Sequence, residues 1–263
     1  MIEFVFSQLL SAGYGAEAQL IKISAIFEEN EFSMWIKPSK SSLDTERSGV
    51  PGLECQNYRY FVDGKLQEPI LSIQEVLKRF REFLMQVKKF ADSPVTIAAH
   101  NAKREFELLI DAIKKTGMAK AFDGIIFGFV DTLPPIQIDL ADDPSIKTFT
   151  LAALARHLLG KTYSGRVHIA SEYLRLLREI IMGNIDPYII AESIERYHNA
   201  ILGVKTVQQG TSNQFGFDDE DGPSGTEPPV QYRNASGRRG SRNWVNKRRG
   251  RYGFDFDRRT ELQ

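Results

Sequence analysis

The feature that most constrains this fold is the spacing of apolar segments near the start of the chain. Three segments typical of β-strands follow one another: Ile2–Phe6, Leu20–Phe27 and Phe32–Ile36. The last two are separated only by a short polar turn, so the pattern predicts an opening antiparallel meander. A loop rich in Ser, Pro and Gly follows at residues 38–57, ahead of a weaker strand pattern at Tyr58–Val62.

Helices and strands then alternate. Ser72-Ile73-Gln74-Glu75 forms a capping box, which predicts a helix that begins there and runs to about Phe90. Further segments indicate a strand at Val95–Ala99, a helix at Lys103–Lys115, a strand at Gly124–Val130, helices at Thr150–Leu159 and Val167–Met182, and a last helix from Asp186-Pro187 to about Leu202. We therefore expect an α/β protein with a central mixed five-stranded sheet flanked by helices.

The chain changes character after Gln208, where Gly, Ser, Asn, Asp and Pro predominate. The few aliphatic side chains of this segment would bury too little apolar surface to offset the conformational entropy lost on folding. We therefore expect a globular domain at 1–208 and a disordered tail at 209–263. The tail is acidic at first. Residues 231–263 then hold ten basic and three acidic side chains, a net charge of +7, which leaves −2 for residues 1–208.

Composition also restricts the compartment. The apolar runs are shorter than the ~20 residues that a bilayer-spanning helix needs, and Cys55 has no second cysteine to pair with. These features favour an intracellular protein, cytoplasmic or nuclear, without a membrane partner.

The basic part of the tail interleaves arginine with glycine and aromatic residues. Its candidate nucleic-acid-binding residues are Arg238, Arg239, Arg242, Trp244, Lys247, Arg248, Arg249, Arg251 and Tyr252. Such side chains attract phosphates and stack on unpaired bases, which predicts binding of RNA or another single-stranded nucleic acid. A solvated linker, a nuclear localisation patch or a protein-binding segment are the alternatives.

Three stretches carry a resemblance to a known family. Residues 4–13 match an apolar strand motif with Gln8 and Leu10 at its Asp and Glu positions. His100-Asn101-Ala102 keeps the start of a second motif, with Glu105 at its Asp position, and His168 keeps the histidine of a third, with Tyr173 at its Asp position. Over about residues 1–182 the chain resembles the DEDDh 3′–5′ exonucleases of the DnaQ and RNase T superfamily, which have a ribonuclease H-like fold. It is also similar to the degenerate exonuclease-like domains of the promyelocytic leukaemia protein and Exuperantia.

The resemblance implies which chemistry is missing. Active members hold two Mg²⁺ or Mn²⁺ ions with four carboxylates and use the histidine as a general base. Here Gln8 offers a neutral amide, Leu10 no ligand and Tyr173 a phenol, so only Glu105 keeps a negative charge. The resemblance therefore implies that no metal cofactor is bound, that no catalytic set is intact, and that the protein is an inactive exonuclease-like protein.

Two other functions remain open at this stage. One is an active metal-dependent exonuclease with relocated ligands, for which Glu3, Glu17, Asp131 and Glu172 are nearby acids. The other is a scaffold that binds only protein partners, or a second copy of itself. We also expect His100 and Asn101 to cap the helix that follows them, and Arg104 is a candidate cation for a phosphate.

Overall fold

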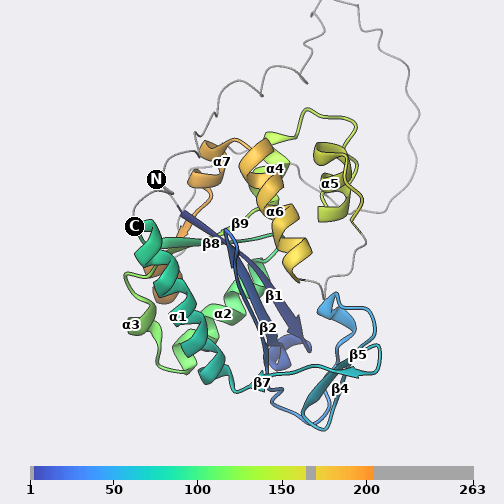
Figure 1. Cartoon of the computed structure of the whole chain (residues 1–263), viewed down its shortest axis with the longest axis vertical. Helices are drawn as coiled ribbons and strands as arrows, with labels where there is room; N and C mark the ends of the chain where they lie inside the picture. The colour runs from blue at the N-terminus through green and yellow to red at the C-terminus, as the bar shows by residue number, and fades with distance from the viewer. Residues whose placement is uncertain (1–2, 164–169, 204–263) are drawn as a thin grey trace, which may run out of the picture. The chain divides into compact units, whose positions relative to one another are not determined.

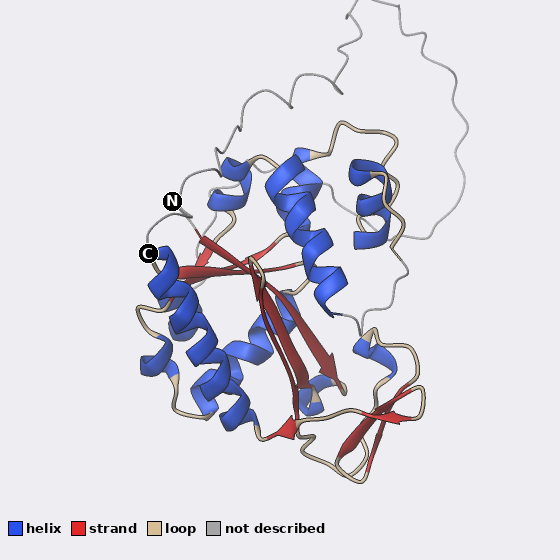
Figure 2. Ribbon diagram, in the orientation of Figure 1, coloured by secondary structure: helices blue, strands red, loops and turns tan. Residues whose placement is uncertain are grey.

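The computed structural model of this chain describes residues 3–163 and 170–203. They form an α/β protein around one mixed sheet with the strand order β10-β9-β8-β1-β2-β3-β7 (Figures 1 and 2). The five longest strands of this sheet are β1 (Glu3–Ala12), β2 (Gln19–Phe27), β3 (Asn30–Ile36), β8 (Val95–Ala99) and β9 (Ile126–Asp131). β2 is antiparallel to both β1 and β3, so the predicted opening meander is confirmed, and β8 and β9 continue the sheet parallel to β1.

The predicted number of strands is wrong. The sheet has seven strands because β7 (Ile70–Leu71) pairs with β3 and β10 (Glu195–Arg196) pairs with β9. Each is two residues long, too short to show any periodicity in the sequence.

Helices cover both faces of the sheet (Figure 1). One face packs against α1 (Ile73–Ala91), α2 (Lys103–Lys115), α3 (Ala119–Phe122) and α8 (Tyr197–Leu202). The other packs against α4 (Leu133–Asp139), α5 (Leu151–Leu159), α6 (Ala170–Asn184) and α7 (Pro187–Glu192). Side chains of β1 alternate between these two cores, since Val5 and Leu9 belong to the first and Phe6 to the second.

Several predicted helix ends are confirmed. The Ser72 hydroxyl accepts a hydrogen bond from the Glu75 N–H at 3.2 Å and so caps α1, which is one of the two hydrogen bonds of a capping box, while the Glu75 carboxylate accepts from Arg79 Nε at 3.0 Å. Thr150 caps α5 in the same way, and Gly160 ends it in the left-handed conformation.

The last predicted helix is interrupted. α7 ends at Glu192, and β10 precedes α8, because Glu195 and Arg196 pair with β9. Gly128 of β9 permits this pairing, since a Cβ atom there would lie 2.5 Å from the Glu195 carbonyl oxygen. Helical periodicity on either side concealed the break.

A second, three-stranded sheet follows β3 in the chain. It consists of β4 (Leu53–Gln56), β5 (Arg59–Val62) and β6 (Lys65–Leu66). β5 confirms the weak strand pattern, whereas β4 lies in the stretch predicted to be a loop. This small sheet packs on Leu10, Trp35 and Ile21 of the large sheet and forms a third apolar cluster with them.

Several sequence predictions lie outside the described residues. They are the boundary at 208/209, the disordered tail at 209–263, the side chain of His168 and all nine candidate nucleic-acid-binding residues of the tail. Within residues 3–163 and 170–203, no helix combines the length and apolarity needed to cross a bilayer.

Candidate functional site

Strand β1 holds the first two positions of the exonuclease-like motif. Gln8 lies opposite Ser24 and Leu10 opposite Lys22 across the β1–β2 ladder, so all four side chains share one face of the sheet. Gln8 and Leu10 are each only 5% exposed. The positions that would hold metal ions in the family are therefore part of the protein interior.

Gln8 supplies a neutral and unsatisfied amide. Within the described part of the chain, neither its side-chain oxygen nor its nitrogen has a hydrogen-bond partner, although both atoms are buried. A buried polar group without a hydrogen bond lowers the free energy of unfolding by about 1–3 kcal/mol, so Gln8 destabilises this face of the sheet.

Leu10 is part of the third apolar cluster. It packs there with residues of the large and the small sheet, namely Ala12, Ile21, Trp35, Leu43, Val50, Leu53, Cys55, Tyr60 and Val62. A carboxylate at this position would be buried among hydrocarbon side chains with Lys22 directly opposite it, and the cost of removing the carboxylate from water exceeds what one such ion pair returns.

Glu105 is the one carboxylate retained at a motif position, and it is held by Ser11. The Ser11 hydroxyl donates a 2.8 Å hydrogen bond to its Oε1 atom, which joins the first turn of α2 to the end of β1. The neighbouring Arg104 donates from Nη2 to the Gly13 carbonyl oxygen at 2.9 Å. Arg104, the candidate cation for a phosphate, thus connects α2 with the residue that follows β1.

Tyr173 occupies the first turn of α6 and is partly buried. Burial raises the pKa of its phenol above the ordinary value, and the neighbouring Tyr163, Asp131 and Glu105 raise it further. The Tyr163 ring stands edge-on at 6.3 Å between centroids. The structure therefore brings Tyr173 near Glu105 and Asp131, as a protonated phenol rather than a third carboxylate.

Asp131, one of the acids considered as a relocated ligand, is engaged with the backbone. Its Oδ2 accepts from the Ala102 N–H at 3.1 Å and its Oδ1 accepts from the Leu133 N–H at 3.0 Å. It stabilises the starts of α2 and α4, the termini at which helices leave N–H groups unpaired.

His100 joins three segments and does not cap α2 as predicted. Its Nε2 lies 2.8 Å from the Phe149 carbonyl oxygen, which only accepts, so Nε2 carries the proton. Nδ1 then accepts from the Thr132 hydroxyl at 3.0 Å. Burial lowers the pKa of His100 below 6.5, while the Phe149 carbonyl and Asp131 oppose this shift. Asn101, the other predicted cap, is exposed and makes no capping bond; Ala102 is the N-cap residue.

Sequence reasoning missed Lys22, which lies directly opposite Leu10. It is 6% exposed, its Nζ atom lies 4.9 Å from the centroid of the Trp35 ring, and burial lowers its pKa. A lysine in the middle of an apolar strand was the available signal. A cationic side chain on this face opposes the binding of divalent cations.

These residues do not fit a two-metal site. One buried amide, one alkyl group and one phenol replace three carboxylates, and hard cations such as Mg²⁺ bind anionic oxygen. Among residues 3–163 and 170–203, no three His, Cys, Asp or Glu side chains lie close enough together to hold a metal ion. The predicted lack of a cofactor stays a prediction, because His168 lies outside these ranges.

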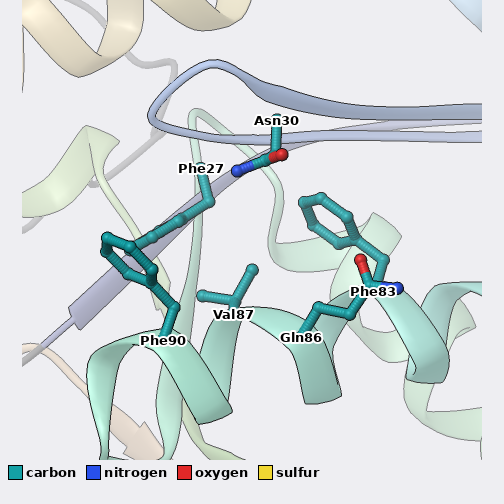
Figure 3. Close-up of a pocket in the computed structure, with 6 residues that line it drawn as sticks. All are labelled: Phe27, Asn30, Phe83, Gln86, Val87 and Phe90. Atoms are coloured by element: carbon teal, nitrogen blue, oxygen red, sulfur yellow. The ribbon is translucent and has the colours of Figure 1, made fainter. Parts of the chain in front are cut away.

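An apolar hollow lies away from these positions, between α1 and the β2–β3 turn (Figure 3). Its volume is about 210 Å³, and the Phe27 and Phe90 rings meet edge to face at 5.9 Å on one side of it. Its lining consists of Phe27, Asn30, Phe83, Gln86, Val87 and Phe90. None of these side chains is charged, so the lining offers no counter-charge to a phosphate or a metal ion.

Comparison with known proteins adds no family assignment. No protein-family model matches the chain, and a comparison with curated proteins finds no significant match. The exonuclease resemblance therefore rests on the motif residues described above.

Restoring the family's glutamate at position 10 should damage the fold. We predict that Leu10→Glu lowers the free energy of unfolding by about 1–4 kcal/mol, because burying the carboxyl group in the apolar cluster costs more than its pairing with Lys22 returns. Leu10→Met, which keeps the volume, should cost less than about 1.5 kcal/mol. Urea unfolding measures both. Equal stability of Leu10→Glu and Leu10→Met would show that position 10 is accessible to water.

The buried His100 should make stability depend on pH. Its pKa is lower in the folded chain than the ordinary 6.5, so the unfolded chain takes up the proton first as the pH falls. Stability should therefore decrease below about pH 6.5. His100→Gln, which does not titrate, should weaken this decrease in urea unfolding at pH 7.5 and 5.5. Thr132→Val is the control, because it removes the hydroxyl partner and keeps the titrating ring; an unchanged pH dependence in His100→Gln would contradict the assignment.

Proposed function

We propose that residues 1–208 form a catalytically inactive exonuclease-like domain with a ribonuclease H-like fold, in a protein that binds RNA or another single-stranded nucleic acid. The order β9-β8-β1-β2-β3, with an antiparallel meander beside two parallel strands, supports this fold. The positions of Glu105 at the start of α2 and Tyr173 at the start of α6 support the alignment of the second and third motifs.

One observation carries the proposed loss of catalysis. Tyr173 lies near Glu105, whereas the two motif positions of β1 hold the buried, unpaired amide of Gln8 and the Leu10 side chain under the small sheet. Two-metal catalysis needs ions that activate water and stabilise the leaving oxygen. Tyr173 supplies no negative charge, because burial keeps its pKa high.

The proposed binding function depends on the basic segment. Residues 1–208 have a net charge of −2, whereas residues 231–263 have +7 together with Tyr, Trp and Phe side chains. Phosphate attraction supplies most of the affinity in binding that is not sequence-specific. We therefore assign most of the affinity to residues 231–263.

Nuclease activity and RNA binding should separate in one experiment. The full chain should bind a 20-nucleotide single-stranded RNA in EDTA and should leave a 5′-labelled copy intact with Mg²⁺ or Mn²⁺. Replacing Arg238, Arg239, Arg242, Arg248, Arg249 and Arg251 by Gln should weaken binding on the order of 100-fold. It should also lower the salt slope, the dependence of log Kd on log salt, by about 4, since each contact to a single strand contributes about 0.7.

The matched control replaces the same arginines by lysine. It keeps the charge and so should keep the salt slope, while it weakens contacts that need a planar guanidinium. Shortening of the RNA from its 3′ end, abolished by His168→Ala, would show an active exonuclease. Failure of the full chain to bind RNA at low salt would favour the protein-binding scaffold instead.

A further inference from the structure

A second hollow lies at the edge of the large sheet where the small sheet adjoins it. It has a volume of about 440 Å³, within the range of pockets that bind small molecules. It is lined by Lys37, Tyr58, Arg59, Glu68, Pro69 and Ile70. These residues come from the end of β3, the turn between β4 and β5, and the segment that leads into β7. The lining thus combines two cations, one carboxylate and an aromatic ring, and the cations outnumber the carboxylate.

Tyr58 presents this ring to solvent from a conformation that bulky residues rarely adopt. Asn57 and Tyr58 have φ angles of +50° and +60°, the left-handed pair at the centre of a type I′ hairpin turn. Asn and Gly are favoured there, whereas a tyrosine is an outlier. Burial does not compensate, because Tyr58 remains 46% exposed. Unfavourable backbone conformations of this kind cluster at ligand-binding sites.

One cation lies over the Tyr58 ring, and a second lines the same hollow. The Lys37 Nζ atom lies 5.7 Å from the ring centroid, and the Lys37 N–H donates to the Leu71 carbonyl oxygen at 2.7 Å, which anchors its backbone. Arg59 follows Tyr58 directly and is exposed. In the part of the chain that the structure describes, neither Lys37 nor Arg59 forms an ion pair with a carboxylate, so both charges are available to an anion.

We infer that this hollow binds one nucleotide of a single strand, with its base stacked on Tyr58 and its phosphate beside Lys37 and Arg59. An exposed ring with adjacent cations matches the way proteins hold unpaired nucleotides, because every base has a face that stacks. The inference rests on the proposed nucleic-acid function and deepens it, since it places a contact in the folded part of the chain. An acidic peptide would satisfy the cations but would leave the exposed ring face without a planar partner.

The hollow is separate from the exonuclease-like positions. Leu10, Lys22, Trp35 and Ile70 form one row across β1, β2, β3 and β7. Three inter-strand steps of about 4.8 Å put Ile70 roughly 14 Å from Leu10, and the small sheet covers Leu10, Ile21 and Trp35 between them. A nucleotide in the hollow therefore does not reach the Leu10 position.

Photo-cross-linking of the full chain tests the inference. The probe is a ten-nucleotide oligouridylate with one 5-bromouridine, and the cross-linked peptides are identified by mass spectrometry. We expect one cross-link on the peptide that contains Tyr58, besides those in residues 231–263. Tyr58→Asn removes the ring and keeps a residue suited to positive φ; it should abolish this cross-link and weaken binding about tenfold. Tyr58→Phe should retain both.

The cations are tested by charge-matched variants. Lys37→Gln combined with Arg59→Gln should lower the salt slope by about 1.4, which corresponds to two lost phosphate contacts. Lys78→Gln combined with Lys89→Gln removes the same charge from two exposed positions of α1 outside the hollow and should leave the slope unchanged.

The outcomes separate the inference from the proposed function. Binding confined to residues 231–263, with no Tyr58 cross-link and full affinity in Tyr58→Asn, would overturn the inference and leave the proposed function standing. Loss of all oligouridylate binding by the full chain would overturn both. A third outcome is that the probe gives no cross-link at Tyr58, while a peptide with the sequence of residues 216–224 shields the Tyr58 ring from chemical iodination. This result would identify a pocket for an acidic peptide and overturn the inference.

Discussion

The packing of the small sheet against the large one is the constraint on which the rest of the molecule depends. Leu10, Ile21 and Trp35 are buried under β4 and β5, and Tyr60 is fully buried against the Trp35 ring, with the two centroids 5.2 Å apart. A face that bound metal ions would have to stay polar and open to water, whereas this face gains stability by excluding water. The same packing that stabilises the fold therefore removes the conditions for two-metal catalysis.

His100, Asp131 and Glu105 each have a structural role in the fold. His100 joins the end of β8 to the segments after β9 and before α5, and Asp131 satisfies backbone N–H groups at the starts of two helices. Glu105 is bound to Ser11. These buried or partly buried polar contacts hold the carboxyl ends of β8 and β9 together. These contacts form a framework of hydrogen bonds beside the apolar cluster that contains Leu10.

Much of the fold was predictable because its signals are local. The Ser72 cap, the three- and four-residue spacing along α1 and the apolar segments of β2 and β8 are patterns of neighbouring residues. The short strands β7 and β10 were not predictable, since their pairing depends on partners far along the chain.

The features of the candidate site likewise fall into those visible in the local sequence and those that depend on tertiary packing. Its missing carboxylates were visible in the sequence, whereas the burial of Gln8 and Leu10 follows from the small sheet. The hollow at Tyr58 likewise exists only where two sheets meet. Binding of Mn²⁺ to the full chain can be followed by the electron paramagnetic resonance of the free ion. We expect no saturable tight binding at micromolar Mn²⁺, because the buried Gln8 and Leu10 offer no anionic oxygen. Saturation at two ions per chain, abolished in Glu105→Gln, would show that a two-metal site exists.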